Sequence, residues 1–276
     1  MRIATVNVNG IRASVRRGFA DWLTQRDCDL IALQEVRSPL EAIPAEATSG
    51  YHCAYHPGNR AGRNGVALLS RVAPTAIREG FGSRRFDPEG RYLEADYELN
   101  GWRLTVASLY LPKGGRADDT PEEKARYQHK LAFLRSFRPY LTRARRTAAA
   151  DGREFLVMGD FNIAHTRADV RNWRGNATSV GFLPEEREWL GTIQSPRTLT
   201  DVVRRLNPDV EGPYSWWSWM GNAFTNDTGW RIDYHFASPT LAAAAEVGGT
   251  DRAASYEERI SDHAPVVVDY ADNGSK

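Results

Sequence analysis

The sequence predicts a layered α/β domain, and three observations support this prediction. Short apolar runs recur along the chain and end in Gly, Pro or polar clusters, as strands do. Longer segments between some of these runs carry the start signals of helices. No linker rich in Pro, Gly or Ser divides the chain. Strands interrupted by helices in one undivided chain are typical of an α/β architecture.

Apolar runs mark the clearest strands. They cover residues 3–8, 30–33, 66–69, 104–111, 155–158, 232–237 and 266–268. The clearest helix begins at Thr120, because a capping threonine, Pro121 at the first helical position and the early acid Glu122 form a strong start signal. Its pattern continues towards Arg146, and a second helix begins near Pro184. Periodicity alone does not give the number of sheets.

The composition is that of a globular protein. Of the 276 residues, 41% are hydrophobic and 26% are charged, which is enough apolar material for a sizeable core. No apolar run approaches the length of a membrane span, so we expect no membrane partner. The N-terminal segment lacks the long apolar stretch of a secretory signal, which favours a cytoplasmic protein. We expect one domain over residues 1–270 and a short disordered tail over 271–276.

The two cysteines, Cys28 and Cys53, form no disulfide framework and agree with a reducing compartment. Cys53 lies between His52 and His56, which looks faintly like a zinc motif. In a strand, however, the two histidines point to one face and the cysteine to the other, so the three cannot converge on one ion. We interpret this segment as structural.

The net charge of +1 leaves the binding partner open. The positive charge is nearly all arginine, whose planar fork suits phosphate, but an arginine-rich coding bias would look the same. Arg143, Arg145 and Arg146 lie on a predicted helix and are interpreted as solvated surface.

Polar residues follow or flank almost every predicted strand, and they are the informative feature of this chain. They are Asn7, Asn9, Glu35, Tyr110, Asp160, Asn162, Asp233, Asp262 and His263. Each alone has an ordinary explanation, since an Asp after a strand usually caps a helix or starts a turn. Several such groups in one chain can converge on one cleft at the ends of the strands.

Hydrolysis of a phosphodiester needs a set of this kind. A hard cation such as Mg²⁺ takes oxygen ligands, and a second carboxylate must orient or deprotonate the attacking water. Hydrogen-bond donors must meet the charge that develops on the phosphate oxygens. Asn and Tyr supply neutral donors, whereas further carboxylates would repel the substrate.

In order and spacing, these residues resemble the exonuclease III-type abasic (AP) endonucleases of the endonuclease/exonuclease/phosphatase superfamily. The matching motifs are residues 7–13 (NVNGIRA), 33–35 (LQE), 65–70 (GVALLS), 159–165 (GDFNIAH), 181–189 (GFLPEEREW), 230–234 (WRIDY) and 261–265 (SDHAP). The match runs from residue 3 to residue 268. The resemblance implies a four-layer α/β/β/α sandwich, in which two mixed β-sheets pack face to face with helices outside.

The resemblance also implies roles for the polar residues. Glu35 would bind Mg²⁺, with Mn²⁺ as a substitute, and Asp262 and Asn9 would lie in or near the metal sphere. Asp160 would position or deprotonate the attacking water, assisted by Asn162. The remaining catalytic residues would contact the phosphate or the leaving oxygen. They are His263, which pairs with Asp233, together with Tyr110 and Asn7. The alternative interpretation of Asp233 and His263 is a buried pair that stiffens a loop.

The implied partner is double-stranded DNA that carries abasic sites or blocked 3′ ends. In the family, aromatic residues at the positions of Trp216 and Trp230 form the walls of a pocket, with an apolar residue at the position of Ile232. This pocket holds an extruded sugar that lacks its base. Core packing is the plain alternative for such tryptophans, and Trp217 and Trp219 are assigned to it. The other implied DNA contacts are Arg12, Lys113, Arg116, Asn172 and Asn176.

Two departures from the family pattern concern charge. Lys113 stands where relatives usually carry Asn or Gln, and Asn9 replaces an aspartate found in some members, which leaves a metal sphere with less negative charge. The leading hypothesis is a cut on the 5′ side of an abasic site that leaves a 3′-hydroxyl, with 3′–5′ exonuclease or 3′-end processing activity. The rivals are a phospholipid or inositol phosphate hydrolase and a non-catalytic DNA-binding paralogue. We expect a bacterial monomer that works on the nucleoid.

Overall fold

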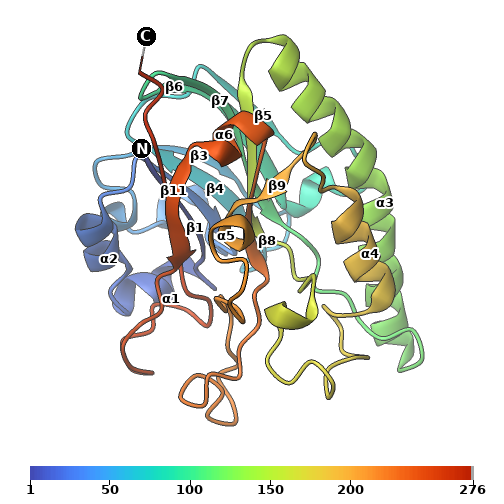
Figure 1. Ribbon diagram of the computed structural model, residues 1–276. Helices are drawn as coiled ribbons and strands as arrows, with labels where there is room; N and C mark the ends of the chain where they lie inside the picture. Colours follow the sequence, from blue (N-terminus) through green and yellow to red (C-terminus); the bar gives the residue numbers. More distant parts are fainter. Residues whose placement is uncertain (275–276) are drawn as a thin grey trace.

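Two six-stranded β-sheets form the centre of the protein in the computed structural model, which describes residues 1–274 (Figure 1). The first sheet has the order β11 (Ala245–Thr250), β12 (Val266–Tyr270), β1 (Arg2–Asn7), β2 (Leu30–Gln34), β4 (Val66–Ser70) and β3 (His52–His56). The second has the order β5 (Ala76–Glu79), β6 (Tyr92–Leu99), β7 (Trp102–Tyr110), β8 (Glu154–Asp160), β10 (Asp233–Ala237) and β9 (Thr200–Asp201). The pairs β1–β2 and β7–β8 are parallel and their neighbours are antiparallel, so both sheets are mixed.

Helices cover the outer faces of the sheets. α1 (Ile11–Arg16) and α2 (Phe19–Arg26) pack on the first sheet, and α3 (Pro121–Ala150) and α4 (Pro184–Thr192) pack on the second (Figure 1). The short helices α5 (Val202–Leu206) and α6 (Pro239–Ala243) pack against the edge of the core between the sheets.

Alternate residues of each central strand face two different cores. In β2, Leu30 and Ala32 belong to the core between the sheets, whereas Ile31 packs with the residues of α1 and α2. In β8, Leu156 faces the same central core and Val157 packs against α3. Strands buried on both faces carry continuous apolar runs, as β2 and β8 do. The predicted four-layer α/β/β/α sandwich is therefore confirmed.

The predicted strands lie close to the observed ones, but the sequence patterns did not reveal β5, β6, β9 and β11. In β6, the charged side chain of Glu94 is buried, and Arg78 of β5 pairs with it at 2.5 Å. Charges within the strand conceal its apolar pattern. The long helix begins as predicted, with the Thr120 hydroxyl accepting a hydrogen bond from the Glu123 amide at 3.2 Å, and it runs on to Ala150.

The start of the chain lies beside the segment that follows β12. The N-terminal ammonium of Met1 donates to the carbonyl of Tyr270 and pairs with Asp272, both at 2.9 Å. The amides of Ala271 and Asn273 donate to the carbonyls of Ala244 and Asn100. These contacts tie residues 271–273 to both sheets, where the sequence had predicted a disordered tail. Residues 275–276 of that predicted tail lie outside the described residues.

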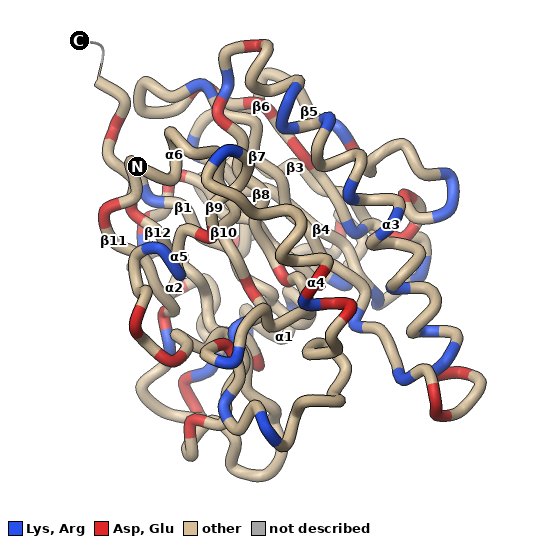
Figure 2. The backbone as a smooth tube through the Cα atoms, turned by 45° about the vertical axis from the view of Figure 1, so that its right-hand side comes forward, with Lys and Arg blue, Asp and Glu red and all other residues tan. Residues whose placement is uncertain are grey.

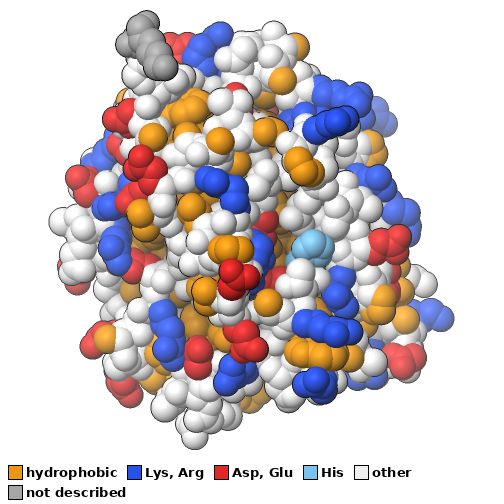
Figure 3. Space-filling model, viewed as in Figure 1, with side chains coloured by type: hydrophobic (Ala, Val, Ile, Leu, Met, Phe, Trp, Pro, Cys, Tyr) orange, Lys and Arg blue, Asp and Glu red, His pale blue; other side chains and the backbone are white. Residues whose placement is uncertain are grey.

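The segment with two histidines and a cysteine forms the edge strand β3. His52 and Cys53 are exposed, whereas His56 is buried with its Nδ1 atom 2.9 Å from the carbonyl oxygen of Tyr92. This hydrogen bond supports the structural interpretation. Hydrophobic side chains are dispersed among charged ones on the face shown in Figure 3. No helix within residues 1–274 is both long and apolar enough to cross a membrane.

Candidate active site

The strand topology brings four predicted site residues to one edge of the two sheets. Asn7 ends β1, and Glu35 follows the parallel strand β2. In the second sheet, Asp160 ends β8 and lies opposite Asp233, the first residue of antiparallel β10. The Nδ2 group of Asn7 donates to Glu35 Oε1 at 2.8 Å and to Asp160 Oδ2 at 2.9 Å. Asn7 thus joins the two sheets at the site.

Asp160 is almost fully buried and receives directed hydrogen bonds. The amide N–H of Asn162 donates to its Oδ1 at 2.7 Å, and the Asn162 side chain donates to its Oδ2 at 3.1 Å. Burial raises the pKa of Asp160 to about 7, with His263 opposing the shift and the negative charges of Asp233 and Glu35 adding to it. A carboxyl group with a pKa near neutrality is suited to accept a proton.

His263 and Asp233 form the predicted pair. The Nδ1 atom of His263 lies 2.8 Å from Asp233 Oδ2, and its Nε2 atom lies 3.8 Å from Asp160 Oδ2. Burial alone would lower the pKa of His263, but the charge and hydrogen bond of Asp233 outweigh it and raise the value to about 10. The imidazole is therefore cationic at neutral pH, with an N–H group available on Nε2.

The donor set around Glu35 fits a hard divalent cation. Atoms of Glu35, Asp160 and His263 that could bind a metal lie within 4.8 Å of one another, and the carboxylates of this group are the fitting ligands because the histidine is cationic. Glu35 also forms an ion pair with Arg37. Burial raises the pKa of Asp160, and the negative charges of Asp233 and Glu35 add to this shift, so a cation beside these carboxylates would favour their ionised forms.

Asp262 lies beside this group, with both of its carboxylate oxygens occupied. Oδ1 accepts from the Asn9 side chain at 2.8 Å and Oδ2 accepts from Trp216 Nε1 at 3.1 Å. Burial raises the pKa of a carboxyl group, but His263, Trp216 and Asn9 together lower that of Asp262. The three predicted metal residues, Glu35, Asp262 and Asn9, line the same pocket, and Asp262 is bonded to Trp216 of its wall.

A pocket of about 390 Å³ opens next to these groups. Its apolar lining contains Trp216, Trp230 and Ile232, together with Val180 and Gly181. The rings of Trp216 and Trp230 meet edge to face with centroids 6.4 Å apart. The three residues predicted to wall a sugar pocket therefore share one cavity with Glu35, Asp160 and His263.

Tyr110 and Lys113 line the same pocket. Burial and the nearby charge of Glu35 raise the pKa of Tyr110 well above its usual value, so its phenol stays neutral and can donate a hydrogen bond. Trp217 is fully buried, as predicted for a core residue, whereas Trp219 is half-buried between Arg17 and Arg259.

The other predicted DNA contacts are separate from the pocket lining of the described chain. They are Arg12, Arg116, Asn172 and Asn176. Arg12 and Arg116 are exposed, and Arg116 lies 3.6 Å from Asp118. Asn176 donates to the carbonyl of Asn172 at 3.1 Å within the long loop after β8. Arg12 lies on α1, and the other three lie on loops.

A second groove, of about 760 Å³, adjoins the pocket and was not predicted from the sequence. Both cavities include Glu35, Arg37, Tyr110 and Lys113. The groove adds Arg63, Arg91, Arg126 and His129 from three further segments. Basic and acidic residues otherwise alternate over the backbone (Figure 2). Isolated arginines carry no motif, so only folding shows that these converge.

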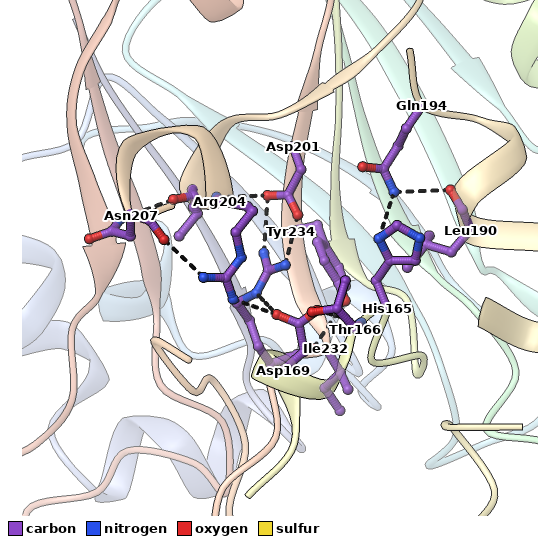
Figure 4. Close-up of polar contacts among 12 residues, drawn as sticks. His165, Thr166, Asp169, Leu190, Gln194, Asp201, Arg204, Asn207, Ile232 and Tyr234 are labelled. Carbon is purple, nitrogen blue, oxygen red and sulfur yellow. Dashed lines mark hydrogen bonds and ion pairs between the residues drawn. The ribbon is translucent and has the colours of Figure 1, made fainter. Parts of the chain in front are cut away.

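A buried ionic cluster lies behind the tryptophan wall (Figure 4). Arg231, next to Trp230, donates to both oxygens of Asp201 at 3.0 and 2.8 Å and to Asp169 at 2.7 Å. Arg204 donates to the same oxygen of Asp169 at 2.7 Å. Beside the cluster, His165 Nδ1 lies 3.5 Å from Gln194 (Figure 4). The cluster holds the segments before and after Trp230 in place.

Taken together, a proton-accepting carboxylate, a cationic histidine and oxygen ligands for a hard cation define the site of a metal-dependent hydrolase of phosphate esters. The sequence profile of the Endonuclease/Exonuclease/phosphatase family matches residues 4–263. The chain therefore belongs to this family, and within it to the exonuclease III-type AP endonucleases.

Several relatives are similar over nearly the whole chain. Exodeoxyribonuclease III of Haemophilus influenzae is 32% identical over 98% of this chain and 100% of its own length. DNA repair nuclease APEX1 of Danio rerio is 32% identical over 97% of this chain and 81% of its own. Among solved structures, an AP endonuclease from Archaeoglobus fulgidus has a TM-score of 0.81 at 26% identity, covering 98% of this chain and 99% of that one. The 3′ phosphatase NExo from Neisseria bound to product DNA hairpin has a TM-score of 0.83 at 27% identity, with the same coverage of both chains.

Proposed function

We propose that the chain is a Mg²⁺-dependent DNA-repair phosphodiesterase that cuts the backbone 5′ to abasic sites and leaves a 3′-hydroxyl. A 3′–5′ exonuclease or 3′-end processing activity would use the same site. The observation that carries the proposal is the single cavity in which Glu35, Asp160 and His263 face a wall formed by Trp216 and Trp230.

Asp160 and its neighbours account for the attack on phosphorus. Asp160 accepts the proton of the attacking water, and Asn162 and Asn7 fix the orientation of its carboxylate through their hydrogen bonds. The Nε2–H group of His263 and the phenol of Tyr110 donate to the phosphate oxygens, where negative charge develops. The bond that breaks joins phosphorus to the 3′ oxygen of the preceding nucleotide.

Glu35 would hold the cation, with Asp160 beside it, and Asp262 would reach it through water because both of its oxygens already accept hydrogen bonds. When bound, Mg²⁺ would stabilise the leaving oxygen and polarise the phosphate. Mn²⁺, which takes similar oxygen ligands, is expected to substitute.

The tryptophan pocket supports selection of abasic sites. A sugar without a base is the cheapest unit to extrude from a duplex, because no stacking is lost with it. A cavity of about 390 Å³ with two indole walls can enclose such a sugar next to the scissile phosphate. The names of the relatives agree with this substrate, since they include DNA repair and AP endonuclease enzymes.

The adjoining basic groove supports a DNA partner. Arg37, Arg63, Arg91 and Arg126 line it together with Lys113, and a row of this kind can follow a phosphate backbone away from the site. A phospholipid or inositol phosphate offers no polymer to fill such a groove. All site residues come from one chain, so a monomer is sufficient for the reaction.

A cleavage assay tests the proposal directly. A 5′-end-labelled duplex with one tetrahydrofuran abasic analogue and an intact duplex are incubated with the enzyme in Mg²⁺ and in EDTA. We expect a single cut 5′ to the analogue that leaves a 3′-hydroxyl and is abolished by EDTA. Binding without a cut would point instead to an inactive paralogue. Neither cutting nor binding would redirect the search to phospholipid and inositol phosphate substrates.

A further inference from the structure

Lys130 is a fully buried lysine on the inner face of α3 and has no part in the mechanism above. Its side chain is 2% exposed, as is that of its partner Glu186 on α4. The buried neighbours of Lys130 on the same helix, Phe133, Leu134 and Phe137, are apolar. A charge at this position therefore requires an explanation beyond the packing of the helix.

The ammonium group of Lys130 uses all three of its donors. It pairs with Glu186 Oε1 at 2.6 Å and donates to the carbonyl oxygens of Asn162 at 2.8 Å and Lys113 at 3.1 Å. Burial lowers the pKa of Lys130, and the charge of Glu186 opposes this shift. Replacing a buried ion pair by apolar residues is often neutral or stabilising, so the pair is weak evidence for a role in stability.

The pair joins two loops that line the active-site pocket. The carbonyls bonded to Lys130 belong to the loop after β7, which carries Lys113, and to the start of the loop between β8 and α4, which carries Asn162. Glu186 Oε2 accepts from the amides of Gly181 at 2.7 Å and Leu183 at 3.1 Å at the far end of the β8–α4 loop. One buried ion pair thus connects the Asp160–Asn162 turn to two walls of the pocket.

The packing at this junction leaves no room for adjustment. A Cβ atom added to Gly114 would lie 2.7 Å from Lys130 Cδ and 3.4 Å from Val180 Cγ1. Gly114 also has a φ of +87°, a conformation that other residues rarely adopt. The loop after β7 therefore packs directly against the lysine side chain and the end of the β8–α4 loop.

We propose that Lys130 and Glu186 are positioning residues that set the distance between the catalytic carboxylate of Asp160 and the pocket walls. They act through the Asn162 carbonyl and the Gly181 amide and touch no substrate. This inference rests on the proposed phosphodiesterase function. A displacement of about 1 Å in such a site can reduce the rate roughly 100-fold, so small movements of these loops matter.

Three variants separate positioning from stability. Lys130→Met leaves Glu186 buried without its cationic partner, and we expect its Tm to fall by roughly 10 °C together with its activity. Lys130→Met/Glu186→Gln removes both charges but keeps an oxygen that can accept from Gly181 and Leu183. We expect the double variant to regain most of the lost Tm. Glu94→Gln is the control: it changes a buried carboxylate of the second sheet that pairs with the partly exposed Arg78.

The readouts are Tm and the separate values of kcat and KM on the tetrahydrofuran duplex. We expect the double variant to keep a kcat about 10- to 100-fold below wild type, with a KM within about threefold. We expect Glu94→Gln to lose Tm without a fall in kcat. A double variant with wild-type Tm and wild-type kcat would overturn the inference, as would a kcat that falls in step with Tm in the control. A wild-type enzyme that cuts no such duplex would instead refute the proposed function.

Discussion

Two buried polar clusters of this protein differ in how their charges are balanced. In the cluster behind Trp230, the carboxylates of Asp169 and Asp201 meet the guanidinium groups of Arg231 and Arg204 at 2.7 to 3.0 Å (Figure 4). In the active site, the carboxylate of Asp160 has amide donors, but its nearest cationic atom, His263 Nε2, lies 3.8 Å away.

The two aspartates respond in opposite directions to the same degree of burial. Burial raises the pKa of a carboxyl group, but at Asp169 the two arginines outweigh it and lower the pKa to about 2. At Asp160 burial prevails and raises the pKa to about 7. A balanced cluster stabilises a fold, whereas an unbalanced one keeps a group ready to exchange a proton or bind a cation. The comparison therefore distinguishes the cluster that stabilises the fold, around Asp169, from the active-site cluster around Asp160.

Replacement of the aspartate in the active-site cluster by asparagine has the largest expected effect on activity. We expect Asp160→Asn to reduce kcat about 10³-fold or more, because no carboxylate remains to accept the proton. Cleavage of the tetrahydrofuran duplex measures this, with DNA binding as the control. Unchanged cleavage would remove Asp160 from the mechanism.

Asp160→Asn should lower activity but raise the stability of the fold. Because the pKa of Asp160 is raised in the folded state, ionising it costs stability as the pH rises through about 7. The usual pKa of this carboxyl group is 3.8, so Asp160→Asn should unfold at a higher temperature than wild type at pH 8, and this gain should shrink with falling pH and vanish below about pH 4. A loss of Tm at pH 8 would contradict the contrast between the clusters.

Asp169→Asn is the matched change in the balanced cluster. It leaves Arg204 without its carboxylate partner, and we expect the free energy of unfolding to fall by about 3 kcal/mol. The pKa of Asp169 is lowered from 3.8 to about 2, so its contribution is present above pH 4 and is lost as the pH falls through about 2. Urea unfolding at pH 7 and at pH 3 would measure both effects. Equal stability of the variant and wild type at pH 7 would show that the cluster does not stabilise the fold.

Trp230 connects the two clusters. Its ring lines the pocket, and the next residue, Arg231, belongs to the buried ionic cluster around Asp169. We expect Trp230→Ala to reduce the preference for abasic over intact duplex roughly 10- to 100-fold, since one aromatic wall is lost. Trp230→Phe keeps an aromatic wall and should retain most of the preference. Equal effects of Trp230→Ala on both duplexes would refute the pocket hypothesis.

The smallest expected effect is a shift in pH dependence. Asp233 raises the pKa of His263, so Asp233→Asn should lower it, and the imidazole should lose its proton at a lower pH. The alkaline limb of the kcat/KM profile should move down by about one pH unit or more. An unmoved limb would mean that His263 acts independently of Asp233 or does not set this limb.

Much of the site could be predicted from single residues, because motifs carry it. Asn7, Asp160 and Asp233 end or begin a strand, Glu35 directly follows one, and His263 lies three residues before β12. The structure gathers all of them at one edge. The sequence predicts less about the residues expected to contact DNA, because their positions depend on how the segments around the site fold. Arg12 and Arg116 lie outside the pocket lining of the described residues, and the sequence gives no distance between either of them and the site.

Strands that contain charged residues were not predicted, because the partners of those charges lie elsewhere in the sequence. β6 carries Glu94 and Asp96, which are accommodated because Arg78 of the neighbouring strand reaches both. A pattern read along one strand does not include its partner. Ionic pairing across strands therefore hides both β5 and β6 from a search for apolar runs.

The sequence by itself determined the α/β class and the central strands and pointed to residues that gather at the candidate site, because apolar period, start signals and motif residues are local properties of the chain. Only the tertiary structure decided that Arg37, Arg63, Arg91 and Arg126 form one groove and that Lys130 lies beneath the catalytic turn. It also decided the charge states, since the pKa of Asp160 and that of Asp169 depend on burial and on partners far away in the sequence. Electrostatic energies depend on distance in space, and the chain sets that distance only when it folds.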